Sequence, residues 1–216
     1  MRARLPRARG GDQQQRSPNQ TRAVRRDDVL LLRLWRAFGE ITSSFDTLNS
    51  IPVYLRHFPS SAPRKMNRPA WVRYHVENYL NELYIFQNRV EALLTLLRRG
   101  YRKQTYSAAL DDQCDLLEEA LRDAFAGVMK ARGSHVHENR FEDTSLRILS
   151  LKELLAKRRA SSARDYRETF LDTKTEKVLW MMRNNASIRK WLDECGISLG
   201  RLLFAENGTF RLPSPP

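Results

Sequence analysis

The sequence predicts an all-α protein in which four or five antiparallel helices form one bundle behind a disordered basic N-terminal arm. Three observations lead to this fold class. Apolar residues recur every three or four positions through most of the 216 residues, as they do on one face of an α-helix. Prolines, glycines and polar clusters divide the chain into segments of helical length. The connections between these segments are modest, which favours antiparallel neighbours in a bundle.

The first segment, residues 1–26, is too polar and too basic to fold by itself. It contains eight arginines and a single acid, Asp12, so its formal charge is +7, more than half of the +13 of the whole chain. Its few apolar residues cannot bury enough surface to offset the entropy of ordering. We therefore expect a disordered arm that attracts polyanions. A mitochondrial transit peptide is the alternative, but the segment lacks an amphipathic period.

The first two helices are separated by a proline-rich stretch. The first helix is expected to begin at Asp27 or Asp28, either of which can cap it, and to extend to about residue 48. Four prolines between residues 52 and 69 indicate a long loop over about 49–68. The second helix is expected over about 69–99, where Gly100 is a natural stop.

Three further helices complete the predicted bundle of residues 27–195. The third is expected over about 107–131, the fourth from Asp143 or Thr144, and the fifth over about 165–193, where Cys195-Gly196 ends it. Residues 196–216 are expected to form an extended or hairpin-like tail, because Asn207-Gly208 favours a tight turn.

Composition excludes several classes of protein. The mean hydropathy is −0.60, and no apolar run approaches the roughly 18–20 residues of a spanning helix, so we expect no membrane partner. Cys114 and Cys195 lie far apart, without the spacing of a zinc site or a disulfide framework, and no nucleotide-binding or metalloprotease motif is present. We expect a cytoplasmic protein that needs no metal and no cofactor.

One polar segment carries the residues best suited to chemistry. Residues 131–140 join the expected third and fourth helices and contain His135 and His137 shortly after Arg132. An arginine, four variable residues and a histidine resemble the motif of the HEPN superfamily, whose members are bundles of four or five helices with this motif near the junction of the last core helices. The match spans about residues 27–195.

The resemblance implies a metal-independent endoribonuclease that acts in defence or in a toxin–antitoxin pair. His137 would exchange protons with the 2′-hydroxyl and the leaving oxygen of RNA, because an imidazole titrates near neutral pH. Arg132 would stabilise the charge that develops on the phosphate. The resemblance also implies a homodimer in which two motifs share one cleft, and an antitoxin-type protein partner. The residues expected to contact RNA are Ser134, His135, Asn139, Lys157 and Arg158.

Other interpretations of the same residues remain open. An arginine in the last turn of a helix interacts favourably with the helix dipole, and a following histidine can cap carbonyl groups. His135 is either solvated, an RNA contact, or a metal ligand together with His137. The chain as a whole could be a non-catalytic bundle that binds nucleic acid or protein, or a structural scaffold. The last of these would use its basic arm only for solubility or for contact with an anionic membrane.

Overall fold

The computed structural model describes residues 26–57, 67–137, 141–158 and 162–213, and only the backbone of 26–28 and 127–137 among them. These residues form five helices and no strand, which confirms the predicted all-helical class. The helices are α1 (Arg26–Arg56), α2 (Arg68–Tyr101), α3 (Ser107–His137), α4 (Thr144–Lys157) and α5 (Ala163–Leu203). None of them is long and apolar enough to cross a membrane.

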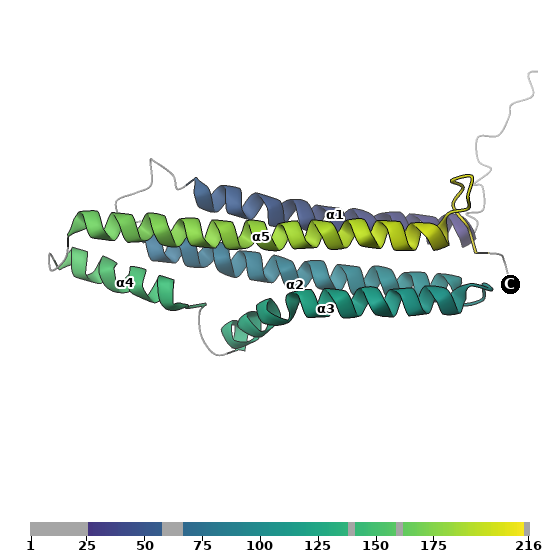
Figure 1. Cartoon of the computed structure of the whole chain (residues 1–216), viewed down its shortest axis with the longest axis horizontal. Coiled ribbons are helices and arrows are strands. Elements are labelled where there is room, and N and C mark those ends of the chain that lie inside the picture. The colour runs from purple at the N-terminus through teal and green to yellow at the C-terminus, as the bar shows by residue number, and fades with distance from the viewer. Residues whose placement is uncertain (1–25, 58–66, 138–140, 159–161, 214–216) are drawn as a thin grey trace, which may run out of the picture.

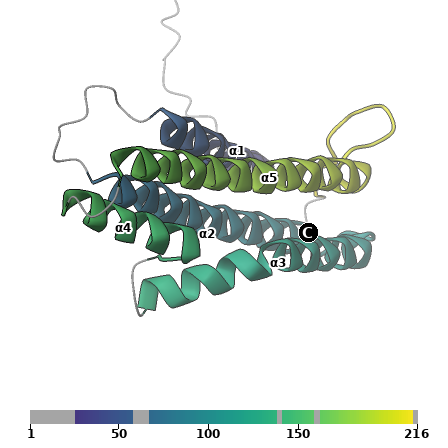
Figure 2. The same ribbon diagram turned by 60° about the vertical axis from the view of Figure 1, so that its left-hand side comes forward.

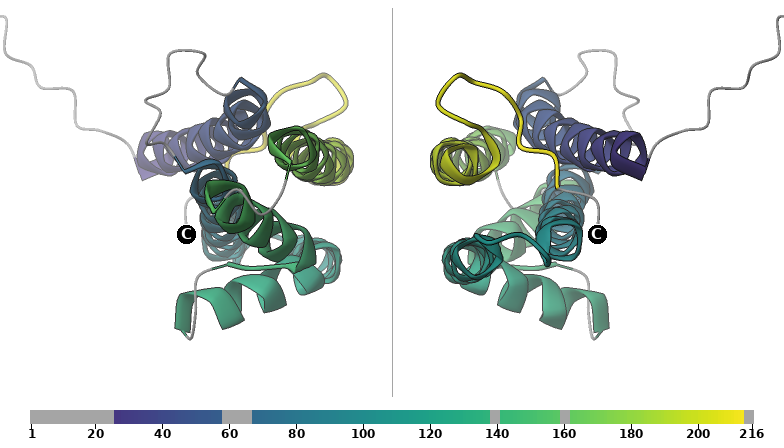
Figure 3. Two further views of the ribbon diagram at one scale, coloured as in Figure 1. Left: turned by 90° about the vertical axis from the view of Figure 1, so that its left-hand side faces the viewer. Right: turned by 90° about the vertical axis from the view of Figure 1, so that its right-hand side faces the viewer.

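The five helices lie roughly parallel or antiparallel to one another (Figure 1). α1 runs in one direction, α2 returns, α3 and α4 follow one another in the direction of α1, and α5 returns along the whole length (Figures 1 and 2). α5 is therefore the longest rod, with 41 residues over about 60 Å. α2 contacts each of the other four helices, and α5 also contacts α1, α3 and α4, whereas α1 and α3 do not meet among the described residues (Figure 3).

Local sequence signals set the start of three helices. The side chain of Asn67 accepts a hydrogen bond from the Ala70 amide at 2.9 Å, and Pro69 occupies the first turn of α2. Asp143 caps α4 by accepting from the Leu146 amide at 3.0 Å. Ser162 caps α5 in the same way. The predicted starts of these helices are confirmed to within a few residues.

The predicted loop over about 49–68 is wrong in its first half, because α1 continues through Pro52 to Arg56. A proline inside a helix has no N–H to donate to the carbonyl four residues earlier. The Leu48 carbonyl oxygen instead accepts a hydrogen bond from Asn185 Nδ2 of α5 at 2.9 Å. A side chain from a distant part of the sequence therefore replaces the backbone donor that proline lacks.

The same asparagine connects three rods inside the core. Its Oδ1 accepts a hydrogen bond at 2.7 Å from the hydroxyl of Tyr79, which is fully buried on α2. Burial raises the pKa of Tyr79 well above its usual value, so this hydroxyl remains a donor at any physiological pH. α1, α2 and α5 are thus held in register by one chain of buried hydrogen bonds.

Three predicted helix ends are also wrong. α2 passes Gly100 by one residue, and the glycine instead permits α1 to approach, because a Cβ built at Gly100 would lie 3.1 Å from the Leu30 methyl carbons. α5 passes Gly196 and Gly200 and ends at Leu203. α3 continues past the expected end at Ala131 to His137. Gly100, Gly133, Gly196 and Gly200 all adopt helical backbone, where glycine costs only about 1 kcal/mol relative to alanine.

The expected turn at Asn207-Gly208 is present. Gly208 has a φ of 76°, and Phe204 and Phe210 form an antiparallel bridge on either side of the turn. The Tyr101 hydroxyl donates to the Arg211 carbonyl at 2.9 Å, which fastens the tail to the end of α2. The hairpin thus closes the end of the bundle at which α1 begins (Figure 1).

Candidate functional site

The segment predicted to carry the chemistry lies in a helix rather than in a loop. Arg132, Ser134, His135 and His137 belong to the last two turns of α3, and their side chains, like residue Asn139, lie outside the described part of the structure. Arg132 and His137 lie five positions apart, and in a regular helix such backbone positions are separated by about 140° around the axis. The ribonuclease assignment therefore stays a prediction.

The two basic residues expected to extend this site lie elsewhere. Lys157 ends α4 and forms an ion pair with Glu153 at 3.3 Å, and Arg158 follows it; both are exposed. α4 leads away from the end of α3, so its last turn lies about 20 Å from its first. Lys157 and Arg158 are thus not brought beside the end of α3.

The residues that follow the α3–α4 connection are fixed by partners on α2 and α5. Arg73 Nε donates to the Phe141 carbonyl at 3.0 Å, and the Phe141 amide donates to Glu77 at 3.2 Å. Asp143 forms an ion pair with Lys177, whose side chain is buried on α5. Burial alone would raise the pKa of Asp143, but the Lys177 ammonium and the hydrogen bonds at its cap lower it below its ordinary value.

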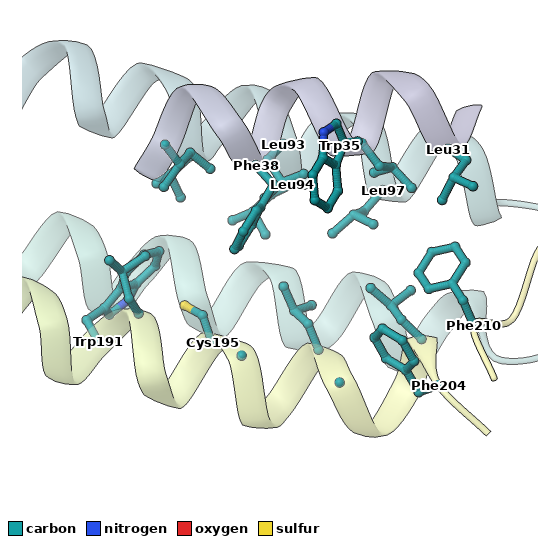
Figure 4. Close-up of a pocket in the computed structure, with 18 residues that line it drawn as sticks. Leu31, Trp35, Phe38, Leu93, Leu94, Leu97, Trp191, Cys195, Phe204 and Phe210 are labelled. Carbon is teal, nitrogen blue, oxygen red and sulfur yellow. The ribbon is translucent and has the colours of Figure 1, made fainter. Parts of the chain in front are cut away.

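An apolar groove lies between α1 and α5, with α2 as its floor (Figure 4). Its volume is about 560 Å³, and none of the 18 residues that line it carries a charge. α1 contributes Leu31, Leu34, Trp35, Phe38 and Ile41; α2 contributes Val90, Leu93, Leu94 and Leu97; α5 and the tail contribute Trp191, Leu192, Cys195, Gly196, Leu199, Gly200, Leu203, Phe204 and Phe210.

A contact between α1 and α5 marks one end of the groove, and a contact within the hairpin marks the other. At its closed end, the Arg189 guanidinium of α5 lies over the Phe45 ring of α1, 5.1 Å from its centroid. Beyond this contact the two helices no longer meet across α2, and their side chains face one another over open space (Figure 4). At the other end the rings of Phe204 and Phe210 pack edge to face at 5.3 Å. The groove is therefore a bounded channel.

Two features of the groove suit an apolar occupant. Trp35 is 75% exposed and Phe38 is 55% exposed, although both line an apolar surface. On the facing helix, a Cβ added at Gly196 or Gly200 would meet no atom within 4 Å. Monomeric proteins rarely leave contiguous apolar surface of this kind uncovered unless it binds something.

The groove offers little for catalysis. Its single thiol, Cys195, is buried, and burial raises its pKa to about 12, so it is protonated and a poor nucleophile at neutral pH. The buried indole N–H of Trp191 is the remaining polar group of note, and it has no acceptor among the described residues. Within the described residues no group of three His, Cys, Asp or Glu side chains could hold a metal ion.

Comparison with protein families, with curated proteins and with solved structures finds no match for this chain. The geometry of the groove is therefore the basis for assigning a function. Sequence periodicity alone does not identify the groove, because it puts Trp35 and Phe38 on the apolar stripe of the first helix, where core packing is the expected role. The available signal was the apolar character of α1 on several sides, since seven of the ten residues from Val29 to Phe38 are large and apolar.

Proposed function

We propose that this protein is a protein-binding helical bundle, and that the groove between α1 and α5 is its docking site for an amphipathic helix. The observation that carries the proposal is the exposure of Trp35 and Phe38 on a bounded apolar channel without charged residues. Aromatic side chains of this kind supply most of the binding energy in protein interfaces.

The dimensions of the groove suit a short helix. From Leu31 to Ile41, α1 rises about 15 Å, and α5 rises about 18 Å from Trp191 to Leu203. A helix of about three turns spans this length and presents apolar residues at every third or fourth position. Such an occupant would extend the bundle by one more rod and remove the exposed rings from water.

A polar small molecule fits the groove less well. Small-molecule sites combine apolar walls with a few convergent polar groups that fix the orientation of the ligand. Here the walls are apolar, and their polar groups are the protonated thiol of Cys195 and the indole N–H groups of Trp35 and Trp191. The same lack of polar groups argues against a reaction at this site.

The proposal is tested with amphipathic helical peptides selected for binding to the full chain from a random peptide library. Trp35→Glu places a charge in the groove and Gly196→Leu fills it, while Leu151→Glu is the matched control, because Leu151 is a 55% exposed residue of α4 outside the groove. Calorimetry should give similar Kd values for the wild type and the control, and Kd values at least about tenfold higher for both groove variants.

Two results would reject this assignment. Selected peptides that bind all four proteins with equal affinity must dock elsewhere on the bundle. A library from which no peptide can be selected would show that the groove does not accept a helix.

A further inference from the structure

We infer that the partner in the groove is a second copy of this chain, whose α1 packs against the groove in a two-fold symmetric dimer. This inference rests on the proposed function and names the partner of the same site. It differs from the dimer that the HEPN resemblance implies, because the residues that line the groove come from α1, α2, α5 and the tail and not from α3.

The first half of α1 exposes apolar side chains and also forms one wall of an apolar groove. The N-terminal half of α1 packs Leu30 and Leu34 against the rest of the bundle, yet it also exposes Trp35, Phe38 and Leu32, the last at 64%. Apolar side chains that extend beyond one face of a helix normally find apolar contacts as well. No described residue of the chain fills the groove beside this helix, so each copy offers both a helix and a channel.

The projecting rings of α1 and the open space on α5 are complementary in shape. Trp35 and Phe38 project from α1, while Gly196 and Gly200 leave open space on α5 across the same groove (Figure 4). In a two-fold symmetric contact, each copy inserts its own projection into the depression of the other. One contact then satisfies both surfaces in both copies, and the assembly closes without forming a filament.

Other segments of the chain are less suitable occupants of the groove. Residues 1–25 precede α1 directly, but their large apolar residues are only Met1, Leu5 and Val24. Residues 58–66 follow the far end of α1, which lies about 20 Å beyond Ile41. Neither segment offers a helical apolar stripe, so we assign the cover to another molecule.

The exposed area is close to that of a stable interface. The large apolar side chains that line the groove and are exposed are Leu31, Trp35, Phe38 and Phe204. If large side chains offer roughly 150–250 Å² each, their exposed parts amount to on the order of 500 Å² per copy, against about 800 Å² per partner in a standard interface. Surrounding backbone and polar atoms would supply the rest.

The test is sedimentation equilibrium of the full chain, whose mass is 25.3 kDa, over a range of concentrations. The wild type and the Leu151→Glu control should approach twice this mass, and Trp35→Glu and Gly196→Leu should dimerise at least about tenfold more weakly. Gly196→Leu keeps the test valid if Trp35→Glu fails to fold, because the added side chain meets no neighbour within the monomer. Circular dichroism verifies the fold of each variant.

Salt provides an independent readout. Each copy carries a formal charge of +13, whereas the groove itself is uncharged, so raising the NaCl concentration should strengthen the dimer by screening the repulsion. A dimer that weakens in salt would be held by charged contacts outside the groove and would contradict the inference.

The outcomes separate this inference from the proposed function. A wild type that is monomeric at every concentration, yet binds the selected peptides in its groove, overturns the second-copy inference and leaves the proposed function intact. A dimer that persists in both groove variants also overturns the inference. If those variants in addition bind peptides as the wild type does, the proposed function fails with it.

Discussion

Asn185 of α5 compensates for a proline inside α1. Pro52 leaves the Leu48 carbonyl without its usual backbone donor, and Asn185 supplies the missing hydrogen bond while accepting one from Tyr79. Proline alone therefore predicted a loop at a position where the chain is helical. The repairing residue lies 137 positions away in the sequence from Leu48, so no local pattern could have shown it.

Asn185→Ala should therefore be strongly destabilising. The substitution leaves the Leu48 carbonyl and the Tyr79 hydroxyl without this partner, at a cost of roughly 2–4 kcal/mol in the free energy of unfolding. Urea denaturation of the purified protein measures this change.

A double-mutant cycle with Pro52→Ala isolates the cause. Alanine at position 52 restores the N–H that can donate to the Leu48 carbonyl, so Asn185→Ala should cost about 1 kcal/mol less in that background. Equal costs in both backgrounds would show that Asn185 does not compensate for the proline.

The ribonuclease hypothesis also makes its prediction at the scale of single residues. If Arg132 and His137 form a HEPN-like site, the purified protein cleaves RNA in the presence of EDTA, and His137→Ala abolishes cleavage while the helical circular dichroism signal is preserved. His57, the exposed histidine at the end of α1, provides the matched control as His57→Ala. Cleavage that survives in His137→Ala would reject the hypothesis.

At the scale of elements, the sequence predicts where helices exist better than where they end. The apolar spacing of α2 identifies Val76, Leu83, Phe86 and Val90 correctly as core residues, because a periodic stripe is a property of one segment. Helix ends depend on neighbours. α5 continues through Gly196 and Gly200 because helical backbone is accessible to glycine and the hairpin provides a later stop.

Gly100 illustrates how packing gives a glycine its role. In wild-type protein, Gly100→Ala should change stability little, because the gain of about 0.5–1 kcal/mol in helix propensity is offset by the close contact with Leu30. With Leu30→Ala the contact disappears, so the same substitution should stabilise the protein by about that amount. Thermal unfolding of the four proteins measures the coupling, and an identical effect in both backgrounds would contradict the assigned contact.

The candidate groove shows the limit of periodicity in another way. Trp35 and Phe38 lie on the stripe that the sequence predicts to be buried, and the structure leaves them exposed. An apolar stripe predicts that a helix face makes apolar contacts, but it does not show whether those contacts come from the same chain or from another molecule. The sequence of α5 does not reveal the groove either, because Gly196 and Gly200 have no side chain that a pattern could identify as part of a binding surface.

At the scale of the whole molecule, charge is distributed unevenly along the chain. Residues 1–26 carry more than half of the formal charge of +13, so they should dominate any attraction to nucleic acid. Deleting them should weaken binding to a single-stranded RNA and reduce the slope of log K against log salt by about 5.

Length and charge can be separated in that experiment. A full-length variant in which the eight arginines of residues 1–26 are replaced by glutamine should behave like the deletion, because counterion release depends on charge rather than on chain length. An unchanged slope in both proteins would show that the basic arm is not the element that contacts the polyanion.

The directions of the helices place both ends of the bundle's chain at the same end of the molecule, because α1, α3 and α4 run one way and α2 and α5 run the other (Figure 1). A chain that goes out and back twice finishes beside its starting point, so the first turn of α1 and the hairpin after α5 flank the same mouth of the groove (Figure 1). The arginine-rich stretch enters α1 at Arg26, only five positions before the first groove residue, Leu31. A second copy docked in this groove brings its own arginine-rich segment toward the same mouth, so the repulsion between the two segments should make the dimer weakest at low ionic strength.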